Sequence, residues 1–241
     1  MKTSEYIKIK TDKFPKGYVF TYNDFITEVN KKEAIIKNLN RMAASGKIIK
    51  LAKGKFYKPE TSVFGTLEPD QYQIAKDLLE KNNKLIGYLT GYGIYNQLGL
   101  TTQVSNTIQI GRKEPRPAIQ RGMYKITFIK QKNTITKENI PLLRLLDAIR
   151  FIKKIPDSTT DTSCNRIKLH LRNLSPERTD TIVRLALKYP PSTRALLGAI
   201  LETIEKKDKT EGLFKSLNPI SKYKLSISSD TLPTKETWNI L

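Results

Sequence analysis

Side chains that could read or hold nucleic acid concentrate in the stretch Lys31 to Ser45, KKEAIIKNLNRMAAS, and in the residues just after it. In the major groove of DNA, asparagine pairs with adenine and arginine with guanine, and each bidentate pair contributes roughly 1–3 kcal/mol of base discrimination. Lysine instead neutralises phosphates, which raises affinity without reading sequence. An ordinary amphipathic helix with a solvated lysine face is the alternative interpretation. On the DNA interpretation, we expect contacts from Lys31, Lys32, Lys37, Asn40, Arg41, Lys47, Lys50, Lys53 and Lys55.

A second basic stretch, RKEPRPAIQRG, runs from position 112 to position 122. Its two prolines and its arginines Arg112, Arg116 and Arg121 favour a stiff, exposed, cationic edge. Together with the tyrosines of the nearby sequence GYLTGYGIY, this edge could form an aromatic and basic surface for RNA or DNA. A solvated loop beside buried tyrosines is the simpler interpretation of the same residues.

The residues that usually carry catalysis or bind metals form no recognisable set. His170 is the single histidine and has no acidic residue within four positions, so a general-base role is disfavoured. Cys164 is the single cysteine, which excludes an internal disulfide and a cysteine zinc site. A nuclease pattern built from Asp157 and Glu205 would need both carboxylates on adjacent strands, yet Glu205 ends a leucine-rich helical segment. We therefore expect no enzyme activity, no metal and no cofactor.

The spacing of apolar residues indicates which elements present the basic side chains. Ile35, Leu39 and Met42 recur at i, i+4 and i+7, which predicts a helix with one buried stripe that ends at Gly46. The sequence after Gly46 predicts two short strands around a Lys-Gly turn. Upstream, the sequence favours a helix over 1–12, a turn over 14–17, a strand over 18–22 and a second helix over 23–29, capped by Thr21 or Asn23. This order is typical of a winged helix-turn-helix, which we place at residues 1–60.

The charge of the chain supports a polyanionic partner. Lysine and arginine number 43 against 23 acidic residues in the 241-residue chain, a formal net charge of +20. Residues 1–60 alone carry 14 basic residues against six acidic ones. An excess of this size indicates nucleic acid as the partner rather than a particular fold. No helix with the amphipathicity of a membrane-surface helix, no membrane-length apolar run and no signal-peptide core is evident, so we expect a cytoplasmic protein with no membrane partner.

The composition changes after Pro59, which predicts a second domain over residues 61–241. Residues 60–65 are expected to form a linker. The part from 61 to 135 favours mixed helices and strands, and the part from 136 to 241 is mainly helical with a polar tail from Asp208. Gly91 and Gly93 at a predicted helix start lack the remaining signature of a phosphate-binding loop, so we assign them to close packing. The predicted fold class is α+β.

Two motifs in this order resemble the AbiEi-type antitoxins of bacterial abortive-infection systems. The sequence FPKGYVF followed by EAIIKNLNRMAASGKIIKLAKGKFYKP resembles the winged domain of that family. Further on, IGYLTGYGIYNQLGLTTQVSNTIQIG resembles its second-domain signature, although Tyr92-Gly93 replace a usual serine-alanine pair. The resemblance covers residues 14–130, and the helical part from 140 to 205 fits it in length and character.

The resemblance implies an antitoxin of a type IV toxin–antitoxin system. In such a protein the winged domain represses its own operon by binding inverted repeats in double-stranded DNA, and the second domain counters a nucleotidyltransferase toxin. Whether the second domain contacts the toxin, its substrate or neither is left open, and our candidate antitoxin surface is Arg112, Arg116 and Arg121. One alternative is a winged-helix transcriptional regulator with a ligand- or protein-binding second domain. Another is a nuclease or nucleic-acid-modifying enzyme that the winged domain anchors.

Overall fold

The protein has an α+β fold in a computed structural model that describes residues 2–26, 32–63 and 65–241. Within this described part, no helix combines the length and apolar character needed to cross a membrane. The α-helices are α1 Thr3–Lys13, α2 Lys32–Ala44, α3 Gln71–Leu79, α4 Tyr92–Gln97, α5 Ile140–Arg150, α6 Thr160–Arg172, α7 Pro176–Ala186, α8 Pro191–Thr203 and α9 Glu211–Lys215. The 3-10 turns are η1 Tyr22–Phe25, η2 Ile152–Lys154 and η3 Lys207–Lys209. The strands are β1 Val19–Thr21, β2 Ile49–Ala52, β3 Lys55–Tyr57, β4 Glu60–Ser62, β5 Gly65–Leu67, β6 Glu80–Lys81, β7 Lys84–Leu85, β8 Gly87–Thr90, β9 Thr107–Arg112, β10 Ile119–Arg121 and β11 Tyr124–Lys130.

The chain divides into two compact units. The first comprises residues 1–78 and 119–125, and the second comprises residues 79–118 and 126–241. A single boundary after residue 60 was predicted, and the division differs from it in two places. The reason is that contacts remote in sequence tie α3 and the segment 119–125 to the first unit: Lys55 forms an ion pair with Asp77 of α3, and the Gly122 amide donates to the Leu51 carbonyl oxygen.

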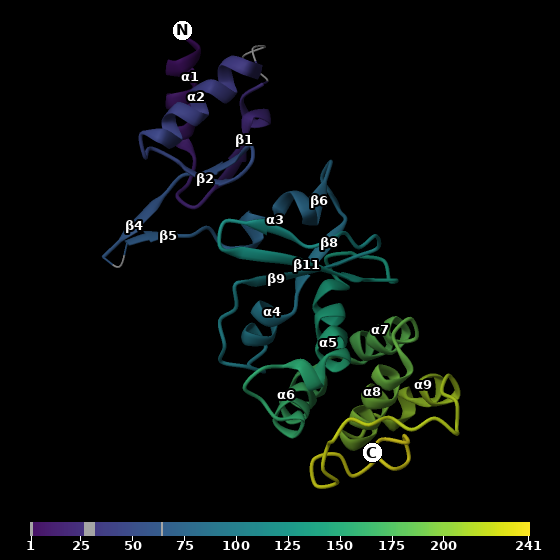
Figure 1. The fold of residues 1–241 in the computed structure, drawn as a ribbon. Coiled ribbons are helices and arrows are strands. Elements are labelled where there is room, and N and C mark those ends of the chain that lie inside the picture. Colours follow the sequence, from purple (N-terminus) through teal and green to yellow (C-terminus); the bar gives the residue numbers. More distant parts are fainter. Residues whose placement is uncertain (1, 27–31, 64) are drawn as a thin grey trace. The chain divides into compact units, whose positions relative to one another are not determined.

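The first unit is built on a small antiparallel sheet of strand order β1-β3-β2, covered by α1 and α2 (Figure 1). Phe20 of β1 lies directly opposite Phe56 of β3, and both rings are buried. Helix α2 adds Ile35 and Leu39, both 0% exposed, and α1 adds Ile7. The helical period of the sequence therefore predicted the buried face of α2 correctly, because residues at i and i+4 share one side of a helix.

Two segments of the first unit differ from the prediction. Strands β4 and β5 pair as an antiparallel hairpin where a linker was expected, since short polar strands carry no alternation of hydrophobicity. The turn η1 begins the predicted second helix, and the predicted cap Thr21 is confirmed: its hydroxyl accepts from the Asn23 amide while its own amide donates to Asp24. The remainder of that predicted helix, from residue 27, lies outside the described residues.

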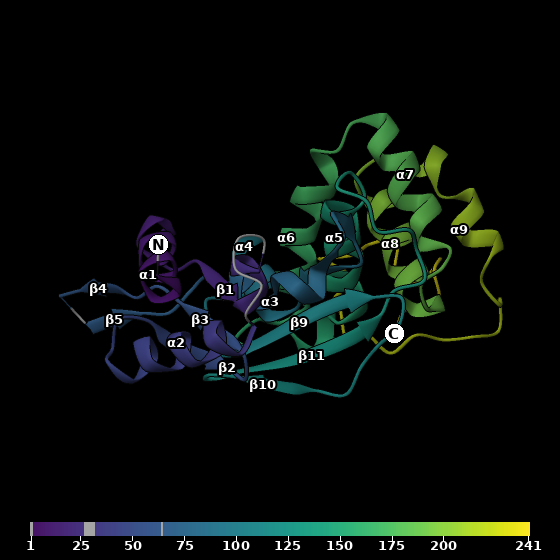
Figure 2. The ribbon, with the colours of Figure 1, turned by 90° about the horizontal axis from the view of Figure 1, so that it is seen from above.

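The second unit consists of a sheet and a group of helices packed around α8 (Figure 2). Within this unit the strands of the sheet follow the order β11-β9-β8, and β8 pairs antiparallel with β9, whereas the residues of β10 belong to the first unit. Helix α8 contacts α5, α6, α7 and α9, and its residues 195–201 are all buried. A helix that is apolar on every side is expected to lie inside a core in this way.

Helix starts in the second unit follow local signals that the sequence contains. The side chain of Ser175 caps α7 and accepts a hydrogen bond from the Arg178 amide, with Pro176 as the first helical residue. Gly91 caps α4 with a φ of 75°, and a Cβ atom there would lie 2.7 Å from the Cβ of Gln109. A larger residue could not occupy this position without a shift, so the close-packing assignment of Gly91 is confirmed.

The C-terminal segment is packed, although a polar tail was predicted. Trp238 is 1% exposed, and its ring passes so close to Gly198 of α8 that a Cβ atom there would lie 2.1 Å from it. The indole nitrogen donates to Glu202 Oε2 at 2.8 Å. The backbone of Tyr223 pairs with that of residues 239 and 241, which closes the segment on itself. Apolar residues spaced without a helical or strand period gave no signal of this packing.

Candidate functional site

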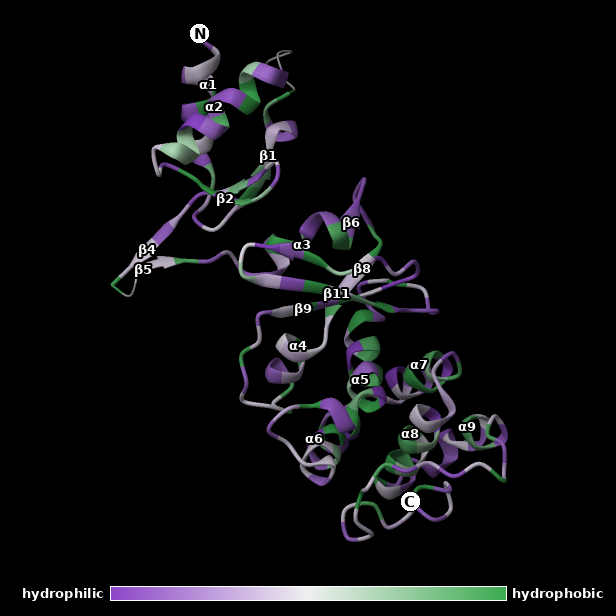
Figure 3. Ribbon diagram, in the orientation of Figure 1, coloured by the Kyte–Doolittle hydropathy of each residue, from purple (hydrophilic) through white to green (hydrophobic). Residues whose placement is uncertain are grey.

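The outer face of α2 carries a row of polar and basic side chains. Lys37, Asn40 and Arg41 are exposed, and they lie on the side of the helix away from the buried Ile35 and Leu39. Figure 3 shows the corresponding alternation of hydrophilic and hydrophobic residues along α2. The helix therefore presents to solvent the amide and guanidinium groups that can form bidentate contacts with base edges.

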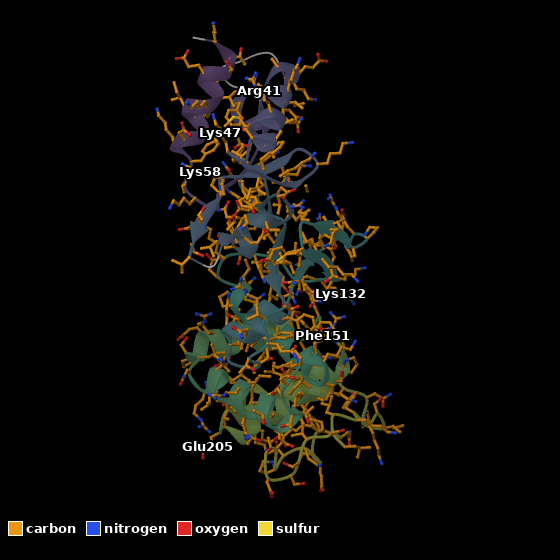
Figure 4. The ribbon with its side chains drawn as sticks, turned by 60° about the vertical axis from the view of Figure 1, so that its left-hand side comes forward. Arg41, Lys47, Lys58, Lys132, Phe151 and Glu205 are labelled. Carbon is orange, nitrogen blue, oxygen red and sulfur yellow. The ribbon has the colours of Figure 1, made fainter. Side chains whose placement is uncertain are left out.

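Arg41 lies beside a groove between α1 and the end of α2. Its Nη2 atom donates to Asn38 Oδ1 at 2.8 Å, which orients the guanidinium along the helix surface. The groove has a volume of about 270 Å³ and includes Lys8 and Lys47 among its lining residues. Figure 4 labels Arg41 and Lys47, which are both exposed. Three cationic side chains thus gather on the same side of the first unit.

Of the predicted DNA contacts Lys31 and Lys32, the structure describes one. Lys31 lies outside the described residues. Lys32 is exposed, and its Nζ atom lies 4.9 Å from the centroid of the Tyr22 ring. This geometry is that of a cation–π contact, which holds the ammonium group near the surface without removing its charge.

The lysines of the β2–β3 hairpin differ in exposure, and one of them is held in an ion pair. Lys50 and Lys53 are exposed, and the turn between the strands is at Gly54. Lys55 is instead half-buried and forms an ion pair with Asp77 Oδ2 at 3.0 Å. The prediction that Lys55 offers its charge to phosphate is therefore weakened, because its ammonium group already has a carboxylate partner.

The predicted arginine edge is not a single exposed surface. Arg121 is 6% exposed and belongs to the first unit, where its Nη1 and Nη2 atoms donate to the two oxygens of Asp77 at 2.6 and 2.9 Å. Burial raises the pKa of Asp77, but the hydrogen bonds and charges of Arg121 and Lys55 lower it below its ordinary value. Arg121 is therefore a structural residue, and its expected exposure was wrong.

Arg112 is also buried, but in the second unit. It is 7% exposed, and its Nε and Nη1 atoms have no hydrogen-bond partner among the described residues. Burial lowers the pKa of this guanidinium, and the neighbouring charge of Arg116 lowers it further. Of the three predicted arginines, Arg116 alone is exposed. The simpler interpretation, with buried tyrosines, is correct for Tyr88 and Tyr95.

A buried carboxyl group that sequence reasoning missed lies at the centre of the second unit. Asp147 of α5 is 0% exposed. Its Oδ2 atom accepts from the hydroxyls of Tyr88 at 2.6 Å and Thr90 at 2.9 Å, and its Oδ1 atom accepts from Tyr189 at 2.9 Å. Burial raises the pKa of Asp147 to about 6, although the three hydroxyls counteract part of that rise. The signal available in the sequence was an aspartate at an inward position of the leucine-rich segment 140–150.

The hydrogen-bond network extends from Asp147 to two loops. Gln131 Nε2 lies 2.8 Å from both the Tyr88 and the Tyr189 hydroxyl oxygens and donates to them. Gln131 Oε1 in turn accepts from the backbone and side-chain nitrogens of Asn133. The loop after β11 and the loop before α8 are consequently held by the same carboxyl group. Networks of buried polar groups in which each member is satisfied fix geometry strongly.

A basic pocket of about 610 Å³ opens beside these two loops. Its lining includes the buried Gln131 and Tyr189 together with apolar Leu187, Pro190 and Pro191. Five cationic residues complete it: Lys130, Lys132, Arg150, Lys188 and Arg194. Figure 4 labels Lys132, and it also labels Phe151, the residue next to Arg150. We call this feature the basic pocket.

The candidate catalytic residues occupy packing positions or separate turns. His170 Nε2 lies 2.9 Å from the carbonyl oxygen of Leu98, and Cys164 is 0% exposed with a thiol pKa that burial raises to about 11. Asp157 and Glu205 follow helical segments, and neither lies on a strand. Across residues 2–26, 32–63 and 65–241, no group of three or more His, Cys, Asp or Glu side chains is placed to hold a metal ion.

Comparison with known proteins identifies a matching family and a solved structure with a similar fold. The family model of DUF6088, described as a family of unknown function, matches residues 6–179. No curated protein sequence matches the chain significantly. The fold is similar to that in the crystal structure of the RV2827C protein from Mycobacterium tuberculosis, with a TM-score of 0.52 over 93% of this chain and 85% of that chain, at 13% identity. At this identity the similarity concerns the fold alone. Because the family model spans well over half of the sequence, the chain belongs to the DUF6088 family.

Proposed function

We propose that the first unit is a winged helix-turn-helix that binds double-stranded DNA and represses transcription of its own operon. The observation that carries this proposal is the exposed outer face of α2, where Lys37, Asn40 and Arg41 point away from the buried stripe. The order of helix, strand, short turn, helix and hairpin supports it. In this assignment α2 is the recognition helix and the β2–β3 hairpin is the wing.

The assignment gives separate roles to amide and ammonium groups. Asn40 reads bases from the exposed side of α2, whereas Lys50 and Lys53 of the wing hold phosphates. Lys55 is excluded from phosphate binding in this proposal, because it is paired with Asp77. The groove with Lys8, Arg41 and Lys47 supplies further positive charge beside α2.

Fluorescence anisotropy with two labelled duplexes tests this function. One duplex carries the inverted repeat upstream of the gene, and the other has the same base composition in scrambled order. Asn40→Ala should weaken operator binding by roughly 1–3 kcal/mol and change binding to the scrambled duplex little. Lys53→Ala should weaken both and flatten the dependence of log K on log salt by about 0.9.

The matched control is Lys81→Ala, which removes the same charge from an exposed residue of the second unit. If Asn40→Ala weakens both duplexes equally, α2 does not read bases through this face. Lys81→Ala should bind both duplexes with the salt dependence of the wild type. If Lys53→Ala also keeps that salt dependence, the hairpin is not a wing that contacts DNA.

We further propose that the second unit acts as the antitoxin against a nucleotidyltransferase toxin, on the support of the sequence resemblance over residues 14–130. Coexpression of the full chain with a nucleotidyltransferase encoded beside it tests this role. The full chain carrying Asn40→Ala and Lys53→Ala should still restore growth, because it retains the second unit. Growth arrest with this variant, and growth with wild type, would assign toxin control to repression instead.

A further inference from the structure

The basic pocket collects positive charge without an acidic residue in its lining. Lys130 and Lys132 flank Gln131, Lys188 precedes Tyr189, and Arg150 and Arg194 come from α5 and α8. Within the described residues, none of these five cations forms an ion pair with a carboxylate. Like charges gathered in a concave site repel one another and raise the local positive potential, which favours an anionic ligand.

The pocket is held in shape before any ligand arrives. Gln131 and Tyr189 are 3% and 6% exposed, and both are tied to Asp147 through the buried hydrogen-bond network. The side chains of Lys130, Lys132 and Lys188 therefore extend from backbone that the network fixes. Cations on a preorganised backbone lose less entropy on binding than cations on free loops.

One charged side chain is also incompletely satisfied inside the pocket. Arg194 lines the pocket, and the Nε atom of its guanidinium has no hydrogen-bond partner among the described residues although it is closed off from solvent. A buried guanidinium nitrogen without an acceptor is unfavourable, so a ligand that draws the guanidinium toward the pocket and bonds it there would reduce this cost. Arg194 thus supplies a donor at the wall of the pocket, while the lysines supply charge nearer to its rim.

The size and the apolar part of the pocket restrict the ligand further. A volume of about 610 Å³ exceeds the space that one phosphate needs and falls in the range of small-molecule sites. Leu187, Pro190 and Pro191 form an apolar strip beside the cations. An anion that also carries a flat apolar ring uses both parts of this lining.

We propose that the basic pocket binds a nucleoside polyphosphate, with its phosphates on Lys130, Lys132, Lys188 and Arg194 and its base against the apolar strip. This site lies wholly within the second unit and does not depend on DNA binding by the first. Phosphate oxygens suit both the guanidinium fork and the lysine ammonium groups.

Isothermal titration calorimetry on the full chain tests the proposal with ATP, tripolyphosphate and adenosine as probes. ATP should bind with a Kd below about 1 mM, tripolyphosphate about tenfold more weakly, and adenosine without detectable heat. The triple variant Lys130→Ala, Lys132→Ala, Lys188→Ala should weaken ATP binding at least tenfold. These three lysines are exposed, so circular dichroism and Trp238 fluorescence should remain as in the wild type.

The matched control removes the same charge elsewhere in the second unit, through Lys81→Ala, Lys137→Ala and Lys222→Ala, three exposed lysines outside the pocket. Equal loss of ATP affinity in both triple variants would overturn the site, because net charge alone would then explain binding. Tripolyphosphate binding as tight as ATP would overturn the assignment of a nucleoside. A single-stranded oligonucleotide that binds more than ten times as tightly as ATP at the pocket lysines would replace the nucleotide by nucleic acid.

Discussion

The buried carboxyl group of Asp147 should make the stability of the second unit depend on pH in an unusual direction. Its pKa is raised from 3.8 to about 6 in the folded chain. Folding therefore favours the protonated form, so the stabilisation is fully present below pH 4 and is lost as the pH rises through 6. Each tenfold difference in acidity corresponds to about 1.4 kcal/mol, and the unfolded carboxyl group is already more than half ionised at pH 4, which gives a loss of about 2 kcal/mol between pH 4 and pH 7.

Asp147→Asn removes this dependence because an amide does not ionise. The amide oxygen can accept from Tyr88 and Thr90, and the amide nitrogen can donate to the hydroxyl oxygen of Tyr189. Relative to the wild type, the variant should therefore become more stable by about 2 kcal/mol on going from pH 4 to pH 7. The measured quantity is the difference in free energy of unfolding between wild type and variant at each pH. The other carboxyl groups are the same in both proteins, so their titration cancels in this difference.

The single tryptophan of the chain provides the assay. Trp238 is buried in the second unit against Phe214, so its fluorescence reports unfolding of that unit. Urea unfolding curves at pH 4, 5, 6 and 7 give the free energies for wild type and variant. Asp230→Asn is the matched control, because it makes the same change on an exposed side chain. Parallel pH profiles for wild type and Asp147→Asn would refute the argument that burial raises the pKa of this carboxyl group.

Three further substitutions test contacts within the units. Arg121→Ala should lower the free energy of unfolding of the first unit by about 2 kcal/mol, because it leaves Asp77 without its bidentate partner. Amide hydrogen exchange in α1 and α2 should become faster in this variant, and Arg121→Lys should restore only part of the protection. Gly198→Ala should destabilise the second unit by about 1–3 kcal/mol and shift the Trp238 emission, since the added methyl group meets the indole ring; unchanged emission would contradict the packing described. Thr159→Ala should cost about 1 kcal/mol in urea unfolding, because the Thr159 hydroxyl caps α6 at the Thr162 amide; Thr181→Ala, on the exposed side of α7, is the comparison that should cost less.

Elements with a strong local signal were predictable from the sequence. The apolar spacing of α2 gave its buried face, and Ser175 followed by Pro176 gave the start of α7, because both signals involve residues within one or two turns. The hairpin of β2 and β3 followed from a glycine turn between short apolar runs. These features needed no knowledge of distant parts of the chain.

Features that depend on distant residues were not predictable. Arg121 contacts Asp77 across 44 positions, so a sequence window shows it only as a basic residue in a proline-rich loop. The Asp147 network joins residues from β8, α5 and two loops, and no spacing rule links them. Candidate contacts on α2 could be named in advance because a helix period sorts buried from exposed positions, whereas the basic pocket assembles from three separate segments, around residues 130–132, 150 and 187–194.

The discontinuity of the first unit has a consequence for synthesis on the ribosome. The chain passes from one unit to the other after residues 78, 118 and 125. A nascent chain that has emerged only to residue 118 contains α2 and the β2–β3 hairpin with Lys55, but it does not yet contain Arg121, the bidentate partner of Asp77. The first unit can therefore reach its final stability only in chains whose translation has already entered the second unit. Premature termination before residue 121 should release a less stable product that proteases degrade. Folded α2 should therefore persist mainly in chains that also contain residues of the second unit.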